Sequence, residues 1–351
     1  MLFLLLFACD AAEDTAATTT CVTELPENNP ENATAGYRYE PVGSALPWNG
    51  ESRSFNVNIW YPTDEPSSVS ARYIGTFDDA ESRVDSPVRE DDCQRPLILY
   101  SHGSQGWGGN NSPMLRTLVA NGWIAAAPDH TDNTLIDDDD EKPVIYPLIR
   151  AADIIATLDW FEGLDASDPL FGHVDTSRVV VLGHSYGAQT AWILSGVGFS
   201  AAGADTACAG GKCTPEERSA FDAPMADARI VAVQPMAGAA SADFVDDTTW
   251  AGTKPILYVT GSEDGDGAEA FDRAETASAA WVELEGGCHE SFTSTTLACD
   301  TLDKAVATPI ITEFTTAFAW SAVLGSEDAG LAGILDGSSE VSAIATVKES
   351  C

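Results

Sequence analysis

The chain has 351 residues, of which 44% are hydrophobic, so it can bury a substantial core and global disorder is not expected. Its 17 basic and 55 acidic residues give a formal net charge of −38. A surface of that sign repels phosphate backbones and anionic lipid headgroups. We therefore exclude nucleic acid as a partner and expect a monomer that meets a membrane only through a covalent anchor.

The beginning of the sequence resembles an export signal. Residues 1–8 are a continuous apolar run, too short to span a bilayer, that ends in alanine just before Cys9. Residues 6–9 resemble a bacterial lipobox, in which the cysteine is lipidated. We expect residues 1–9 to be a leader, residues 10–36 to be a disordered tether, and the protein to be secreted or held at the cell envelope. Secretion without a lipid is the alternative.

Eight cysteines in an exported chain predict disulfide bonds. No CxxC pair is present, so the expected role of the cysteines is structural and no zinc site is predicted. Short separations favour two small loops, closed by Cys208 with Cys213 and by Cys288 with Cys299. Three others would compete for one further bridge: Cys21, Cys93 and Cys351.

Short β-rich runs alternate with helical stretches, which predicts one α/β domain over residues 37–325 with a mostly parallel sheet of about eight strands. Strands are expected, in chain order, at 55–62, 96–101, 123–128, 178–183, 229–233, 254–260 and 280–284. Helices are expected at 113–121, 146–162, 186–194, 268–280 and 309–324.

Four segments need separate interpretation, because their sequences differ from that of a buried strand or a covering helix. Residues 55–62 alternate with period two, which predicts a half-exposed strand near one end of the sheet. The polar residues 63–95 are interpreted as a long surface connection. Residues 196–228, rich in glycine and alanine, are expected to form a small insertion or cap loop. The tail 326–351 receives no structural assignment.

The sequence G-H-S-Y-G at 183–187 fits the G-x-S-x-G pattern of a nucleophile elbow. The pattern is short, but here it follows a β-branched strand and begins an apolar helix, as an elbow requires. Ser185 is therefore the predicted nucleophile. A serine hydroxyl is a weak nucleophile until a base takes its proton, so an imidazole must come from elsewhere in the chain.

His289 is the predicted base, because it follows the last short strand and the elbow fold takes its triad in the order Ser, Asp or Glu, His. The predicted acid is Asp264, just after strand 254–260, where it would hold the imidazole tautomer. Three other acids remain as rivals: Glu263, Asp266 and, more remotely, Asp243.

An oxyanion hole needs two preorganised N–H donors. The amide of Tyr186, directly after the nucleophile, is one expected donor, and Ser104, after strand 96–101, is the other. Trp107 and His184 lie beside these segments and are predicted to contact substrate.

Other polar and aromatic groups are given no chemical role. The acidic run 137–141 lacks the ligand spacing of a known calcium loop and is interpreted as a solvated charge run. Trp192 and Trp320 are assigned to the core. No cofactor or metal is expected.

Four motifs together resemble the branch of α/β-hydrolases that includes the platelet-activating-factor acetylhydrolases and dienelactone-hydrolase-like proteins. They are I-W-Y-P at 59–62, S-H-G-S at 101–104, A-A-P-D-H at 126–130 and the elbow itself. G-G-C-H at 286–289 is similar to the cutinase-like bacterial polyester hydrolases. The resemblance covers residues 40–324 and implies an α/β-hydrolase fold.

The same resemblance implies Ser185, Asp264 and His289 as a triad, with Ser104 and Tyr186 as oxyanion donors. Two features depart from the family pattern. Dienelactone hydrolases use a cysteine nucleophile where this chain has serine. The mammalian-type acetylhydrolases take their acid after the strand that corresponds to 229–233, where this chain has Gln234-Pro235.

Together these features predict a serine carboxylic-ester hydrolase that works through an acyl-enzyme, with a small-molecule or polymeric ester as substrate. Lipase, phospholipid acetylhydrolase or peptidase activity on the same triad is one alternative. A surface-anchored binding protein without turnover is the other.

Overall fold

The computed structural model describes residue 22 and residues 33–238, 254–265, 279–294 and 299–350. Within them, eleven strands form one sheet in the order β11-β10-β9-β8-β7-β5-β6-β2-β1-β4-β3. The strands are β1 (Ala35–Ala45), β2 (Ser52–Tyr61), β3 (Ser70–Tyr73), β4 (Phe77–Val84), β5 (Arg95–Ser101), β6 (Ile124–Asp129), β7 (Val174–His184), β8 (Ile230–Met236), β9 (Ile256–Gly261), β10 (Ala279–Leu284) and β11 (Ala345–Ser350).

The six strands from β10 to β6 run parallel. At one end β11 pairs antiparallel with β10, and at the other β2, β1, β4 and β3 extend the sheet in antiparallel pairs, except that β1 and β4 are parallel. The apolar run Val179 to Val181 of β7 is fully buried, as is all of β5. Parallel strands covered on both faces need such continuous apolar runs, because neither face meets water. The sequence placed these central strands correctly for that reason.

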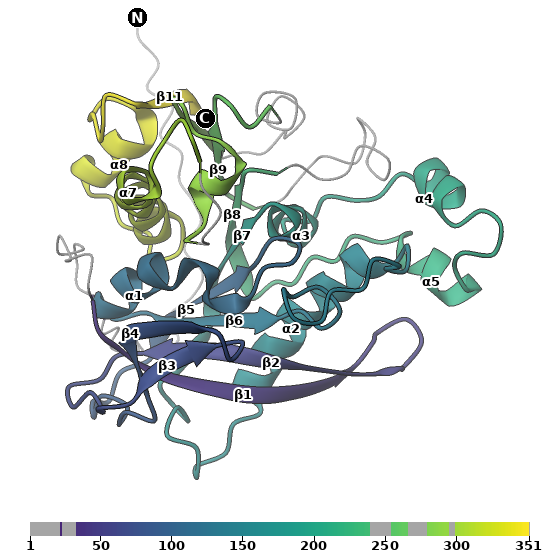
Figure 1. The fold of residues 1–351 in the computed structure, drawn as a ribbon, viewed down its shortest axis with the longest axis horizontal. Helices are drawn as coiled ribbons and strands as arrows, with labels where there is room; N and C mark the ends of the chain where they lie inside the picture. The colour runs from purple at the N-terminus through teal and green to yellow at the C-terminus, as the bar shows by residue number, and fades with distance from the viewer. Residues whose placement is uncertain (1–21, 23–32, 239–253, 266–278, 295–298, 351) are drawn as a thin grey trace, which may run out of the picture.

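Helices cover both faces of the sheet (Figure 1). One hydrophobic cluster packs beneath α2 and α3, and a second beneath α1 and α7. The helices are η1 (Gly108–Asn111), α1 (Ser112–Ala120), α2 (Tyr146–Glu162), α3 (Tyr186–Leu194), α4 (Ala201–Ala207), α5 (Pro215–Ala220), η2 (His289–Phe292), α7 (Lys304–Ala322) and α8 (Ala329–Asp336). No helix in these ranges is long and apolar enough to cross a bilayer.

The N-terminal half of the sheet is larger than predicted. β2 was predicted to be a half-exposed strand near one end of the sheet, but β1, β4 and β3 lie outside it and its residues 55–61 are buried except for Asn56. Residues 63–95, predicted to be a surface connection, contain β3 and β4, and β4 pairs with β1 in parallel. The first five residues of β4 alternate between half-buried and exposed positions, so its polar sequence has the composition of a loop although its backbone is a strand.

The C-terminal part also differs from expectation. The unassigned tail forms α8 and β11, and β11 pairs antiparallel with β10. The last long helix begins at Lys304 rather than at Pro309, because the Asp303 side chain accepts a hydrogen bond from the amide of Ala305 and caps an earlier turn. Pro309 lies inside that helix. The predicted helix 268–280 lies outside the described residues, apart from its last two positions, which begin β10.

The cysteine pairing follows the sequence where the structure tests it. Cys208 is bonded to Cys213 between α4 and α5, which lie at one side of the molecule, and Cys288 is bonded to Cys299 (Figure 1). Cys93 is also disulfide-bonded. The remaining cysteines of the prediction lie outside the described residues: Cys9, Cys21 and Cys351.

Replacing Leu99 by alanine tests whether the central strand β5 carries the stability of the sheet. Leu99 is fully buried, so Leu99→Ala should lower the free energy of unfolding by about 2–5 kcal/mol through lost burial and a cavity. Leu135, which is 52% exposed, is the matched control, and Leu135→Ala should change it by less than about 0.5 kcal/mol. Denaturant unfolding measures both, and equal effects would contradict the assignment.

Candidate active site

Ser185 lies at a sharp turn between β7 and α3, with φ 55° and ψ −116°. L-residues rarely adopt such a backbone conformation, which persists only where the surrounding structure imposes it. Glycine is required on both sides. A Cβ atom at Gly183 would overlap the carbonyl of Gly187, and one at Gly187 would overlap the carbonyl of Ser101. The turn therefore has the geometry that a nucleophile elbow needs.

The Ser185 hydroxyl begins a continuous hydrogen-bond relay. It donates to Nε2 of His289 at 2.8 Å, and Nδ1 of His289 donates to Oδ1 of Asp264 at 2.7 Å. The Asp264 side chain is 2% exposed, whereas that of His289 is 43% exposed. The relay therefore runs from a buried carboxylate to an imidazole that is open to solvent, and so to an incoming molecule.

The acid and the imidazole meet because they follow neighbouring strands. β9 and β10 pair in parallel, so the loops after them emerge at the same edge of the sheet. These loops approach so closely that a Cβ atom at Gly261 would overlap the carbonyl of Gly287. The amide of Glu263 donates to that carbonyl at 2.9 Å. Of the rival acids, Glu263 has an exposed side chain, and Asp243 and Asp266 lie outside the described residues.

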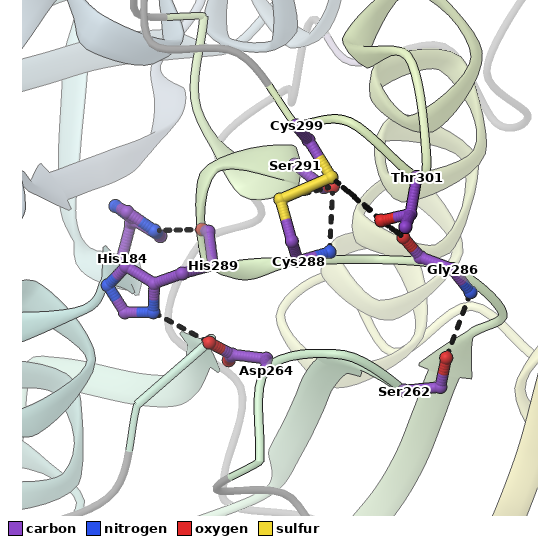
Figure 2. The surroundings of a disulfide bond; sticks show 9 residues. All are labelled: His184, Ser262, Asp264, Gly286, Cys288, His289, Ser291, Cys299 and Thr301. Carbon is purple, nitrogen blue, oxygen red and sulfur yellow. Dashed lines mark hydrogen bonds and ion pairs between the residues drawn. A yellow bond between two sulfur atoms is a disulfide. The ribbon is translucent and has the colours of Figure 1, made fainter.

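The loop that carries the imidazole is held from several sides (Figure 2). The disulfide between Cys288 and Cys299 ties its base to the segment before α7. The amide of Gly286 donates to the hydroxyl of Ser262 at 2.9 Å, which joins the loop to the one that carries the acid. The backbone of the loop that carries His289 is thus held both by a disulfide bond and by a hydrogen bond to the neighbouring loop.

His184 supports the imidazole from the side of the elbow. Its Nε2 donates to the backbone carbonyl of His289 at 2.9 Å, and the two rings lie 5.0 Å apart (Figure 2). Burial, with a smaller contribution from the nearby His289, lowers the pKa of His184 to about 4. The ring is therefore neutral at neutral pH. Its predicted contact with substrate stays a prediction.

The segment with the predicted second oxyanion donor contacts Ser185. Residues 103–106 form a turn in which the amide of Gly106 donates to the carbonyl of Gly103 at 3.0 Å. A Cβ atom on Gly103 would lie 3.1 Å from the Cβ of Ser185. Tyr186 is the first residue of α3, and the first amides of a helix have no acceptor within it. Ser104 and Tyr186 each follow one residue of this contact in the chain, and their roles as oxyanion donors stay predictions.

Trp107 is a packing residue in this structure. It is 5% exposed, and its indole stacks on Phe77 of β4 at 4.1 Å between ring centroids, with an angle of 2° between the planes. It offers little surface to a ligand, and its predicted substrate contact stays untested. Trp192 and Trp320 are buried, as predicted for core residues.

Carboxylates of the acidic run 137–141 form hydrogen bonds and an ion pair with groups close by in the chain. Asp137 accepts the amide of Thr134 at 2.8 Å, and Asp138 accepts from the ammonium of Lys142 at 2.7 Å. Within the described ranges no group of three or more histidine, cysteine, aspartate or glutamate side chains could hold a metal ion.

Arg150 has no predicted role, although its guanidinium is fully buried and donates a hydrogen bond to the backbone carbonyl of His102, just before the 103–106 turn. The available signal was a single charge within an apolar stretch of helix, because Leu148, Ile149, Ala151 and Ala152 surround it. Burial of an unmatched charge is costly, so such a residue indicates a local function or a buried polar network.

Comparison with known proteins defines the fold. No protein-family model and no curated protein sequence matches this chain. Among solved structures, a ferulic acid esterase from Streptomyces cinnamoneus is similar, with 21% sequence identity and a TM-score of 0.63. The alignment covers 90% of this chain and 97% of that one. The chain therefore has an α/β-hydrolase fold, as the resemblance in its motifs implied.

That fold alone does not define an activity, because α/β-hydrolase scaffolds host many reactions and 689 chains of solved structures match this one. The branch with the acetylhydrolases is not established by the likeness.

The buried, neutral His184 gives a pH-dependent prediction. Between pH 6.5 and about 4 the unfolded chain binds a proton at this position and the folded chain does not, so acid lowers the stability that His184 contributes. In His184→Gln the amide can still donate to the His289 carbonyl but cannot titrate. As the pH is lowered, the free energy of unfolding of wild type minus that of the variant should therefore fall by at most about 1.4 kcal/mol per pH unit.

Denaturant unfolding at several pH values between 7 and 4.5 measures this difference. The subtraction removes the opposite effect of Asp129, whose pKa burial raises to about 6, since both proteins contain it. A difference that does not vary with pH would contradict a neutral His184.

Proposed function

We propose that this protein is a serine carboxylic-ester hydrolase, with Ser185 as nucleophile, His289 as general base and acid, and Asp264 as the group that orients the imidazole. The observation that carries the proposal is the continuous relay from the Asp264 carboxylate through His289 to a serine held at φ 55°. Such an alignment of three groups from three separate loops matches a nucleophile, its base and the orienting acid.

The first half of the reaction forms an acyl-enzyme. Ser185 Oγ attacks the ester carbonyl carbon while Nε2 of His289 removes its proton, and the amides of Tyr186 and Ser104 donate to the developing oxyanion. Asp264 then faces an imidazolium and stabilises its charge. The protonated imidazole passes its proton to the departing alcohol, and the C–O bond breaks.

The second half repeats these steps with water. His289 takes a proton from a water molecule, the resulting hydroxide attacks the acyl carbon, and the Ser185 oxygen leaves with the returned proton. The acid product is released and the enzyme returns to its starting state. Every group in this scheme belongs to the chain, so it requires no cofactor.

The proposed substrates are small or medium acyl esters, with natural or synthetic polyesters as further candidates. A half-exposed imidazole beside the nucleophile supports access for a bulky or polymeric ester. The resemblance to the acetylhydrolase and polyester-hydrolase branches supports ester cleavage over amide cleavage. The similar solved structure is described as a ferulic acid esterase, which agrees with this reaction type.

The proposed location is outside the cytoplasm, in secreted form or attached through a lipid on Cys9. Disulfides persist in oxidising compartments, and the pairs at 208–213 and 288–299 support that location. A peptidase or lipase on the same relay is the alternative activity. A binding protein without turnover would keep the fold and lack reactivity at Ser185.

Labelling by a fluorophosphonate separates an enzyme from a binding protein. Wild type should react with one equivalent and lose its activity on a p-nitrophenyl ester, because the probe bonds to an activated serine oxygen. Ser185→Ala should abolish labelling and lower kcat by about 10⁶-fold. Ser195, which is buried and followed by glycine, provides a control in Ser195→Ala, which should label normally. A wild-type protein that stays unlabelled would refute the proposal.

Asparagine and glutamine substitutions identify the acid. Asp264→Asn preserves shape but removes the charge that fixes the imidazole tautomer, so kcat should fall by about 10⁴-fold. Glu263→Gln, one residue earlier on the same loop, is the matched control and should change kcat by less than about threefold. Steady-state kinetics on the same ester measures both. The reverse order of the two effects would assign the acid to Glu263.

A further inference from the structure

A single arginine lies beneath the oxyanion segment and contacts its backbone. Arg150, on α2, is fully buried. Its Nη2 donates to the backbone carbonyl of His102 and, at 3.0 Å, to the hydroxyl of Ser101. Ser101 ends β5 and His102 begins the segment that leads into the 103–106 turn. The guanidinium is therefore hydrogen-bonded to the first residues of the segment that contacts Ser185.

A second arm of the same guanidinium reaches Ser104. Nη1 donates to Oδ1 of Asn133 at 2.5 Å, and Nδ2 of Asn133 donates to the hydroxyl of Ser104 at 2.9 Å. Asn133 is buried and both ends of its amide are engaged, so it acts as a fixed spacer. Arg150 thus restrains the first half of the turn twice, directly at the His102 carbonyl and through Asn133 at Ser104.

The guanidinium also lies over the side chain of Tyr186, the other predicted donor. Its Cζ lies 4.7 Å from the centroid of the Tyr186 ring, within the range of a cation–π contact. Nε donates to the hydroxyl of Thr190, one turn further along α3, at 3.4 Å. One planar group therefore touches both structural elements whose amides are proposed to bind the oxyanion.

The positive charge of Arg150 has no carboxylate within ion-pair distance among the described residues. The nearest acid on its helix, Asp153, is already engaged by Arg53 at 2.6 Å and by His130 at 2.8 Å. Burial holds the pKa of His130 and of His102 well below their usual range, and the charge of Arg150 acts in the same direction. The two imidazoles are therefore neutral, and the guanidinium is the cation beside the oxyanion segment.

We propose that Arg150 is a positioning residue for the oxyanion hole. Its guanidinium fixes the Ser104 turn relative to the N-terminus of α3, so that the two amides converge, and its charge favours the anionic tetrahedral state over the neutral ester. The inference rests on the proposed esterase function. Because an interaction that strengthens in the transition state raises kcat with little effect on KM, the role has a kinetic signature.

Substitution of Arg150 tests the role. Arg150→Met fills the space without the charge or the hydrogen bonds, and kcat should fall by about 100-fold with KM changed less than about threefold, as for the loss of an oxyanion donor. Affinity for a boronic acid, which forms a tetrahedral adduct with the serine oxygen, should fall by a similar factor. Arg150→Lys keeps the charge and loses the planar fork, so it should recover part of kcat.

Two further variants keep the test decisive if Arg150→Met does not fold. Asn133→Ala removes the bridge from Arg150 to Ser104, together with a hydrogen bond to Asp138, and leaves the other contacts of Arg150 in place. It should lower kcat by about tenfold at constant KM. Arg53→Met is the matched control, since Arg53 is a largely buried arginine beside α2 that contacts Asp153 and neither donor segment. It should leave kcat within about threefold of wild type, whatever its effect on thermal stability.

The outcomes separate this inference from the proposed function. Wild-type protein with neither ester turnover nor fluorophosphonate labelling would overturn the esterase function itself. An active wild type, with folded Arg150 and Asn133 variants that retain wild-type kcat and boronate affinity, would overturn only the role of Arg150. Equal losses of kcat in Arg150→Met and Arg53→Met would also overturn it, because both would then report general damage to the buried network.

Discussion

The structure depends on a crossing of backbones that leaves no room for side chains. At the end of β5, at the end of β7 and at the start of α3, a Cβ atom on Gly183 or Gly187 would overlap a carbonyl group. Because these backbones are in contact, β7, α3 and the segment that follows β5 cannot move independently. The amide of Ser185 also donates to the carbonyl of Met236 at the end of β8, which adds a fourth element to the crossing. The unusual conformation of the serine is therefore imposed by packing that extends through the centre of the sheet.

A second close approach, between Gly261 and Gly287, has the same effect on the other half of the site. It joins the loop of the acid to the loop of the imidazole, and the disulfide from Cys288 adds a covalent restraint. The two halves are joined by the pairing of β8 with β9 and by His289, which accepts a hydrogen bond from the Ser185 hydroxyl at Nε2 and one from His184 at its backbone carbonyl. The geometry of the relay is thus restrained by both close approaches and by the sheet between them.

The sequence predicted the central strands and the meeting of Ser185, Asp264 and His289, because continuous apolar runs and chain order carry that information locally. It could not predict strand β4, whose alternating polar residues are satisfied by partners distant in the chain. The stacking of Trp107 on Phe77 depends on that pairing and was missed with it. Arg150 was missed for a related reason: its role depends on hydrogen bonds to groups distant in the chain, such as the His102 carbonyl, which a charge within a helical sequence does not reveal.

The last strand, β11, covers the edge of β10 by antiparallel pairing, and Lys348 forms an ion pair with Glu283 across that edge. Without β11, the amides and carbonyls along one side of β10 would be left unpaired, and such an edge is a template for pairing with another chain. A shortened chain that ended before residue 345 could keep all the groups of the proposed relay and still associate edge to edge. The final residues thus bear on the solubility of the protein as a recombinant product, and on where an affinity tag can be attached or a domain fused.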